Sequence, residues 1–549
     1  MRTDPEIALS FKLRPIDDIA GELGIASERL IHYGRHIAKV DSKLLEELKG
    51  RPDGKLILVT AMSPTPAGEG KTTLTIGLTQ SLKLLGRKAA ACLRQPSLGP
   101  FFGAKGGATG GGLSQVLPAD DITLQFTGDD YSIVTAHNLI SSVIDNHMYH
   151  ATLPIDPARI LWPRASTVND RTLRKLRVPV GKAGGGRDEE FVISAASEMM
   201  SILSLSLSLT DFRERAGRVV VAFCKDGKPV TIADLGVTGA AAALFKNAIH
   251  PNLVQSNEGA PVFIHGGPFG NISIGCNSLL ATKLALKLSD YVLTEAGFAT
   301  ELGAEKFFDI KCRCGDLKPS AAVIVATLKA LRLHGGSKDY LKTDTASMVR
   351  GLENLEKHIE NIKKFGVPSI VAVNRYHDDT EEELSALLGA LGERGVSAHV
   401  VDVRERGGAG GVEAAGALLA LSENHPNFKY LYQLNIPVAE KINIVAREMY
   451  GALDVEFTGE AKRDIEEIGS FGYSTLPVCV AKTPKSLSDD PDLLGRPLGF
   501  KVSVRRVKID AGAGFLVAVC GNVLLMPGLP KHPLAEEIDI DGDGKVTGF

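Results

Sequence analysis

The chain has 549 residues, which is too many for one hydrophobic core, so we expect several domains. Its composition, 44% hydrophobic and 23% charged, is that of a soluble globular protein. The 62 basic and 65 acidic residues are well mixed and leave a net charge of −3, so the sequence shows no electrostatic footprint for nucleic acid.

The sequence also indicates where the protein works. Residues Met1–Glu6 lack the cationic and apolar regions of a signal peptide, and no uninterrupted apolar run approaches the length of a membrane span. The seven cysteines are scattered and lie mostly inside apolar runs, as buried reduced thiols do. We therefore expect a cytoplasmic protein with no membrane partner.

In chain order, residues 1–50 indicate short amphipathic helices, and from 55 to about 350 apolar strands alternate with helical patterns. The strands are expected at Leu56–Ala61, Ala89–Leu93, Val219–Phe223, Val262–His265, Tyr291–Glu295 and Ala321–Thr327. This alternation predicts an α/β fold with a parallel sheet and helices on both faces. Ser201–Thr210 alternates like a strand but continues the helical pattern of Phe191–Met200, and its serines can bond back to the preceding turn, so we expect helix there.

Two further regions follow. A second α/β unit is expected from near Pro368, with a strand, a helix and a strand at Ser369–Asn374, Thr380–Gly392 and Ala398–Val403. From about 435 to the end, a helix and two strands are expected at Ala439–Tyr450, Val502–Val507 and Phe515–Val519.

A glycine-rich loop follows the apolar run Leu56–Val59 and precedes a helical pattern over Thr72–Leu85. Its residues are Thr65, Pro66, Ala67, Gly68, Glu69, Gly70, Lys71, Thr72 and Thr73. A strand, a glycine-rich turn and Lys-Thr opening a helix form the arrangement that surrounds nucleotide phosphates with backbone N–H groups. Lys71 would neutralise the terminal phosphates, and the Thr72 hydroxyl would bind Mg²⁺. The alternative is a glycine-rich turn before an ordinary helix, since Thr65 replaces the first glycine of the usual pattern.

Arg94 follows the strand Ala89–Leu93, so it should emerge at the same carboxyl edge of the sheet, where open α/β sheets bind ligands. Its planar guanidinium fits a carboxylate or an acyl phosphate, although a surface salt bridge would use it equally well. The glycine run Gly103–Gly112 beside it is a candidate lid.

Two other strand ends carry polar side chains. Glu295 ends the strand Tyr291–Glu295 and could bring a carboxylate to a Mg²⁺–phosphate centre, or it could be an exposed acidic strand end. His265 ends another strand and could act in acid–base work, or it could be a hydrogen-bonded structural histidine.

Long ordered motifs resemble one family over essentially the whole chain. The motifs are TPAGEGKTT from Thr65, RQPSLGP from Arg94, FTGD from Phe126, DLGVTGAAAAL from Asp234, HGGPFGNI from His265, the segment Thr294–Arg313 and MPGLPK from Met526. They are similar to those of formate–tetrahydrofolate ligase (10-formyltetrahydrofolate synthetase). The resemblance implies that formate, ATP and tetrahydrofolate give 10-formyltetrahydrofolate, ADP and phosphate through formyl phosphate. It assigns Lys71 and Thr72 to ATP–Mg²⁺ and Arg94 to formate or formyl phosphate.

The resemblance also implies an organisation. It indicates a large nucleotide-binding, P-loop-like domain over 1–365, a second α/β domain with folate-contacting loops over 366–434, and a C-terminal α+β domain over 435–549. The family is usually a homotetramer.

One departure from the family concerns a monovalent cation. The residue after the arginine is usually a glutamate associated with a cation that assists the reaction, and here it is Gln95. A neutral amide removes the charge that favours a cation, so we expect weak or absent activation by potassium or ammonium.

The second departure concerns folate. The family stacks the pterin between an aromatic residue, which Tyr376 matches, and a tryptophan shortly before a GG-x-GG loop. Here the tryptophan position falls on Arg404, ahead of Gly407 and Gly408. A guanidinium can stack on a heteroaromatic ring, so folate binding survives in altered form, or the folate function is lost. The alternative function is a divergent paralogue that binds ATP with another acceptor or has a non-catalytic role.

Overall fold

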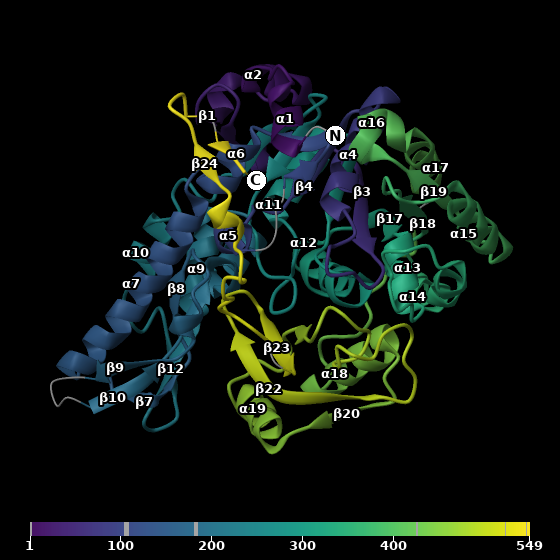
Figure 1. The fold of residues 1–549 in the computed structure, drawn as a ribbon. Coiled ribbons are helices and arrows are strands. Elements are labelled where there is room, and N and C mark those ends of the chain that lie inside the picture. The colour runs from purple at the N-terminus through teal and green to yellow at the C-terminus, as the bar shows by residue number, and fades with distance from the viewer. Residues whose placement is uncertain are drawn as a thin grey trace.

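The computed structural model describes residues 3–103, 109–180, 185–423, 426–521, 523–544 and 546–548. Within this part of the chain, twelve strands form one mixed sheet at the centre of the molecule (Figure 1). Its main path runs β1 (Leu30–His32), β2 (Ala38–Val40), β14 (Asn252–Ser256), β15 (Pro261–Ile264), β4 (Ala89–Leu93), β16 (Tyr291–Glu295), β3 (Lys55–Ala61), β17 (Pro319–Ala326), β18 (Ser369–Asn374) and β19 (Ala398–Val401). The strands β5 (Gly110–Gly111) and β6 (Ser114–Leu117) lie off this path.

The seven strands from β15 to β19 are parallel, as the alternation of strands and helices predicted. The prediction was wrong at one edge, where β14, β2, β1 and β6 run antiparallel. It was also wrong for Val219–Phe223, because β12 (Val220–Cys224) lies in a separate antiparallel sheet with β7 (Ile155–Ile160) and β13 (Pro229–Thr231).

Helices cover both faces of the central strands, because successive side chains of a buried strand point to opposite faces. Ile57 and Val59 of β3 pack with α4 (Lys71–Leu84) and α17 (Val412–Ser422) in one apolar cluster. Leu56 and Leu58 point the other way, into the cluster that contains α11 (Leu279–Leu288) and α14 (Thr345–Lys364).

Other helices fill the connections and the amino-terminal region. They are α1 (Asp4–Leu9), α2 (Ile16–Leu23), α3 (Leu44–Glu47), α5 (Leu98–Gly103), α6 (Ala119–Leu124), α7 (Asp129–His150), α9 (Leu209–Arg218), α10 (Thr238–Ala243), α12 (Arg313–Gly315), α13 (Leu328–His334), α15 (Glu381–Glu393) and α16 (Val403–Arg406). In the part of the chain that the structure describes, no helix combines the length and apolarity needed to cross a bilayer.

The stretch expected to be helical over Phe191–Met200 and Ser201–Thr210 is divided. It contains strand β11 (Phe191–Ile193), helix α8 (Glu198–Leu205) and the start of α9. The back-bonding of its serines is confirmed, because the Ser204 and Ser206 hydroxyls donate to the carbonyls of Met200 and Ile202 at 2.8 and 2.7 Å.

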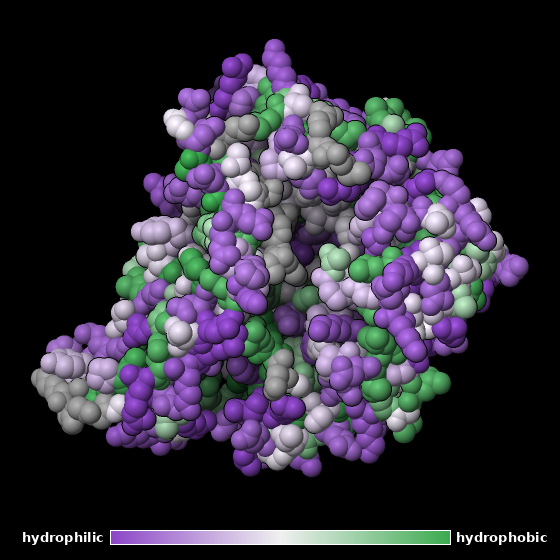
Figure 2. Space-filling view, viewed as in Figure 1, coloured by the Kyte–Doolittle hydropathy of each residue, from purple (hydrophilic) through white to green (hydrophobic). Residues whose placement is uncertain are grey.

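The remaining strands form small sheets. β8 (Arg164–Ser166) pairs with β11, β9 (Leu176–Val180) pairs with β10 (Gly185–Glu189), and β24 (Asp539–Ile540) pairs with β25 (Val546–Thr547). The C-terminal region, at the bottom of Figure 1, has its own sheet of β20 (Asp454–Phe457), β22 (Lys501–Asp510), β23 (Phe515–Cys520) and β21 (Val478–Ala481), with helices α18 (Val438–Val445) and α19 (Gly459–Ser470). Figure 2 shows that hydrophilic side chains dominate this view of the molecule and that a hollow opens near its middle.

Candidate active site

Three predicted site residues meet at the carboxyl edge of the central sheet. Strand β16 lies between β3 and β4, and all three are parallel. Thr72 lies in the first turn of α4 after β3, Glu295 is the last residue of β16, and Arg94 follows β4. The order of the strands therefore brings these side chains to one place.

The Glu295 carboxylate joins the other two residues. Its Oε2 accepts a hydrogen bond of 2.6 Å from the Thr72 hydroxyl, and its Oε1 accepts from Nε and Nη2 of Arg94, each at 3.3 Å. Glu295 is 2% exposed, so its alternative interpretation as an exposed strand end is wrong. The Arg94 side chain keeps 28% of its surface exposed and so remains open to a ligand.

The phosphate-loop segment has a backbone that requires glycine. Gly68 and Gly70 have φ of 83° and 75°, in the left-handed region. Gly70 immediately precedes α4, and a Cβ there would lie 2.5 Å from the Asn374 side-chain nitrogen. Lys71 is the first residue of α4, so the loop delivers Lys71 and Thr72 together at a helix N-terminus, where anions bind favourably.

Glu69 braces this loop from inside. The side chain is 1% exposed, and its two carboxylate oxygens accept from the Thr65 backbone N–H at 2.7 Å and from the Thr327 hydroxyl. The Asn374 amide donates to the Glu69 carbonyl at 3.1 Å. Sequence reasoning missed Thr327 and Asn374 as supports of the loop, because each becomes its neighbour only through strand order.

The oxygen atoms of Thr72 and Glu295 fit a magnesium ion, which prefers hydroxyl, carboxylate and phosphate oxygens. The two side chains already contact each other, and Glu295 is largely withdrawn from water. Gln95, the predicted monovalent-cation position, donates its backbone N–H to the Gly266 carbonyl at 2.7 Å. Its side-chain Oε1 is buried without a hydrogen-bond partner among the described residues, so Gln95 could offer a cation one neutral oxygen ligand.

Tyr376 connects the predicted folate region to the phosphate loop. It follows β18, and its hydroxyl donates to the Gly68 carbonyl at 3.3 Å. The Lys329 ammonium lies 4.5 Å from the centre of its ring. Burial, with a further contribution from the Glu69 carboxylate, raises the pKa of Tyr376 to about 12, so the hydroxyl stays protonated as a donor.

Arg404 points to the amino terminus of the chain. Its Nη2 donates to Oδ1 of Asp4, the first residue of α1, at 2.8 Å, and 46% of its side chain is exposed. Gly407 and Gly408 lie in the 3₁₀ helix η6 (Gly407–Gly411) and are buried. The Gly408 N–H donates to Glu258 at 3.0 Å, and its carbonyl accepts from Ser81 of α4 at 2.7 Å.

Two other predictions have structural outcomes. His265 is buried, and its two ring nitrogens lie 2.7 Å from the Ser278 hydroxyl and the Ala248 carbonyl. Burial lowers the pKa of His265 to about 4, which identifies it as a neutral structural histidine. The candidate lid Gly103–Gly112 includes residues 104–108, which lie outside the described residues.

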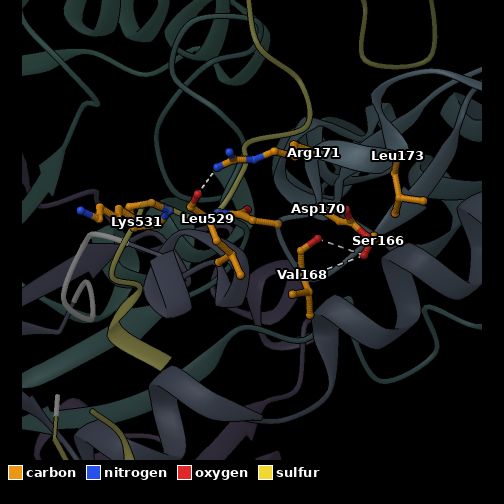
Figure 3. A pocket seen from close by; sticks show the side chains of 9 residues that line it. Ser166, Val168, Asp170, Arg171, Leu173, Leu529 and Lys531 are labelled. Carbon is orange, nitrogen blue, oxygen red and sulfur yellow. Dashed lines mark hydrogen bonds between the residues drawn. The ribbon is translucent and has the colours of Figure 1, made fainter. Parts of the chain in front are cut away.

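A separate pocket of about 680 Å³ lies between the 3₁₀ helix η2 (Arg171–Arg174) and the C-terminal tail (Figure 3). In Figure 3, Arg171 reaches across to the Leu529 carbonyl, to which it donates a hydrogen bond. The lining residues are Ser166, Val168, Asn169, Asp170, Arg171, Leu173, Leu529, Pro530 and Lys531, and none of them was a predicted site residue.

Comparison with known families identifies the chain. The model of the family described as formate–tetrahydrofolate ligase matches residues 2–549, so this protein belongs to that family of ATP-dependent ligases. Among solved structures, pyruvate kinase from Cryptosporidium parvum is 10% identical, with 88% of this chain and 92% of that chain covered and a TM-score of 0.17. A similarity of that size carries no argument about fold or function.

Proposed function

We propose that this member of the formate–tetrahydrofolate ligase family joins formate to tetrahydrofolate through formyl phosphate, giving 10-formyltetrahydrofolate, ADP and phosphate. One observation carries the proposal beyond family membership: the Glu295 carboxylate contacts both Thr72 of the phosphate loop and Arg94. A phosphoryl donor bound at the first and a carboxylate bound at the second would therefore be neighbours.

The first half-reaction activates formate. Formate is a poor electrophile because its charge is delocalised over two oxygens, so it must be activated before the amine can attack. One formate oxygen attacks the γ-phosphorus of ATP, and ADP leaves. Lys71 would neutralise the transferring phosphoryl group. Thr72 and Glu295 would hold a magnesium ion, which would offset charge on the phosphate oxygens. The Arg94 guanidinium, which contacts Glu295 on one side and keeps 28% of its side chain exposed, would bind the formate carboxylate.

The second half-reaction transfers the formyl group. The N10 amine of tetrahydrofolate attacks the formyl carbon, phosphate leaves, and the amine loses its proton. Tyr376 would present one ring face to the pterin, because its opposite face carries Lys329 and its hydroxyl is anchored on Gly68. Arg404, Gly407 and Gly408 would complete the acceptor end.

We also propose the organisation implied by the family: a nucleotide-binding domain over 1–365, a folate-contacting region over 366–434, a C-terminal domain over 435–549, and a cytoplasmic homotetramer. The separate sheet β20–β22–β23–β21 supports the last border. The middle border is less sharp in the fold, because β18 and β19 continue the central sheet.

A second candidate function is a paralogue that forms formyl phosphate for another acceptor. It is favoured by Arg404, whose guanidinium is paired with Asp4 at the position where the family has an aromatic ring.

One assay separates the two functions. ADP release is measured with formate, with and without tetrahydrofolate, alongside ATP synthesis from ADP and formyl phosphate without folate. Full turnover with tetrahydrofolate supports the ligase. Formyl-phosphate-dependent ATP synthesis without folate turnover supports the paralogue, and an absence of both reactions overturns both functions.

A further inference from the structure

The loop between β15 and α11 forms one wall beside Arg94. A Cβ at Gly267 would lie 2.5 Å from the Gln95 carbonyl oxygen, so the loop backbone presses directly on the residue after Arg94. At the other end of the loop, the Gly275 carbonyl accepts from the Gly297 N–H at 2.7 Å. A Cβ at Gly297 would lie 3.0 Å from Nη1 of Arg94, so Gly297 lies against the guanidinium.

The wall is tightly packed. A Cβ at Gly275 would lie 2.6 Å from the Gly270 Cα, and a Cβ at Gly270 would lie 2.9 Å from the Phe298 ring. Phe298 itself has φ of 60°, a strained conformation for a bulky residue that only a rigid surrounding maintains. The shape of this wall therefore depends on whatever fixes the loop.

Lys306 fixes it. This lysine lies between two π-helical segments, η4 (Thr300–Ala304) and η5 (Phe307–Cys312), and is fully buried. Its ammonium donates to the Gly270 carbonyl at 2.8 Å and to the Asn271 carbonyl at 2.7 Å. Buried carbonyls of an irregular loop need donors, and a charged donor forms the stronger hydrogen bonds.

The neighbouring acid, Glu305, forms no hydrogen bond to the Lys306 ammonium among the described residues. Glu305 is fully buried, and both of its carboxylate oxygens lack a hydrogen-bond partner among the described residues. Burial, followed by the nearby Asp309 carboxylate, raises the pKa of Glu305 well above its ordinary value. The Lys306 ammonium therefore donates its hydrogen bonds to the loop carbonyls rather than to Glu305.

We infer that Lys306 is a positioning residue for the carboxylate pocket: it holds the loop over residues 266–275 against Arg94 and so sets the fit to a one-carbon carboxylate. This inference rests on the proposed function. It distinguishes Lys306 from Lys71 and Arg94, because Lys306 is separated from the ligand by the loop that it holds.

The test compares Lys306→Met with Lys441→Met. Lys441 in α18 is a matched control, because it is also a fully buried lysine that donates to two backbone carbonyls, those of Ser474 and Leu476, and it lies in the C-terminal region. Steady-state rates are measured with varied formate and with varied ATP, and thermal melts confirm that each variant folds.

For Lys306→Met we expect the KM for formate to rise about tenfold or more, while the KM for ATP stays within about twofold of the original value, since the phosphate loop is untouched. Lys306→Gln keeps an uncharged donor, so its KM for formate should lie between those of Lys306→Met and the unaltered protein. This variant decides the comparison if Lys306→Met does not fold. Lys441→Met should leave both KM values unchanged.

The experiment distinguishes failure of the positioning role of Lys306 from failure of the proposed function. If the unaltered protein turns over formate but the Lys306 variants keep its KM for formate, or raise both KM values equally, the positioning role is wrong. If the unaltered protein and Lys441→Met both lack formate-dependent ADP release, the proposed function itself fails.

Discussion

The two ends of the candidate site differ in how their residues are engaged. At the phosphate–carboxylate end, the Glu295 carboxylate accepts hydrogen bonds from both Thr72 and Arg94. At the acceptor end, Tyr376 is anchored on the phosphate loop, but Arg404 is paired with Asp4 from the amino terminus. The hydrogen bonds that join Thr72, Glu295 and Arg94 do not involve Arg404, so under the proposed function Arg404 can change while the phosphate–carboxylate end is kept.

The largest expected effect tests the phosphate–carboxylate end. Lys71→Ala should lower formate-dependent ADP release by about 10³-fold or more, the scale expected for a charge that stabilises phosphoryl transfer. The matched control is Lys83→Ala on the same helix, since Lys83 contacts Glu22 and the Gly259 carbonyl instead. Equal rates for the two variants would mean that the ATP site lies elsewhere.

Glu295→Gln tests the junction between the two substrates. The amide preserves a hydrogen-bond acceptor for Thr72 but removes the charge, so the rate should fall roughly 10²-fold and more Mg²⁺ should be needed for half-maximal activity. A magnesium titration of ADP release measures both. Glu258→Gln, an acid that binds Gly408 at the acceptor end, is the control and should leave the titration unchanged.

Arg404→Trp would sharpen the comparison at the acceptor end. An aromatic ring opposite Tyr376 should lower the KM for tetrahydrofolate by about two- to tenfold, which corresponds to the energy of one aromatic pair. Steady-state kinetics with varied tetrahydrofolate measure this change. Arg404→Gln breaks the pair with Asp4 without adding a ring, so a gain in both variants would assign the effect to the lost ion pair.

Gln95→Glu tests the monovalent cation. With the neutral amide, rates in potassium and in tetramethylammonium should agree within about twofold, and the carboxylate should make the rate depend on potassium because charge favours a cation. The readout is the ratio of rates in the two salts at equal ionic strength. Strong potassium activation of the unaltered protein would show that the Gln95 amide suffices.

The smallest expected effect is on stability. Burial raises the pKa of Asp309 to about 7 and that of Glu305 well above its usual value, so the folded state holds protons that the unfolded chain releases. Stability should therefore be fullest in acid and fall as pH rises toward and through these folded-state pKa values. Glu305→Gln should flatten this dependence and raise the Tm at pH 8 by a few degrees, whereas the exposed Glu382→Gln should not. An unchanged pH profile of the Tm would contradict the prediction.

Much of the phosphate–carboxylate end could be predicted from the sequence. The strands β4 and β16 have the predicted bounds, Ala89–Leu93 and Tyr291–Glu295, because each is an apolar run that ends in a polar residue. Once both strands are taken as parallel, the rule that parallel strands share a carboxyl edge brings Arg94 and Glu295 together.

Other features have no local signal. The strands β1 and β2 contain three residues each, too few for an alternating pattern, so residues 1–50 were expected to be only helical. The helix expected over Ala439–Tyr450 ends in a π-helical turn, η7 (Ala446–Tyr450), which periodicity cannot distinguish from α-helix. Lys306 was missed because its partners are backbone carbonyls, which any sequence supplies.

The contact between Asp4 and Arg404 spans 400 positions of the chain and has a practical consequence. A purification tag fused ahead of Asp4 would sit beside the region where the acceptor is expected to bind, and proteolytic trimming of the first few residues would leave a bare guanidinium there. Preparations that differ only in such processing should therefore differ in their behaviour toward tetrahydrofolate while agreeing in their behaviour toward ATP.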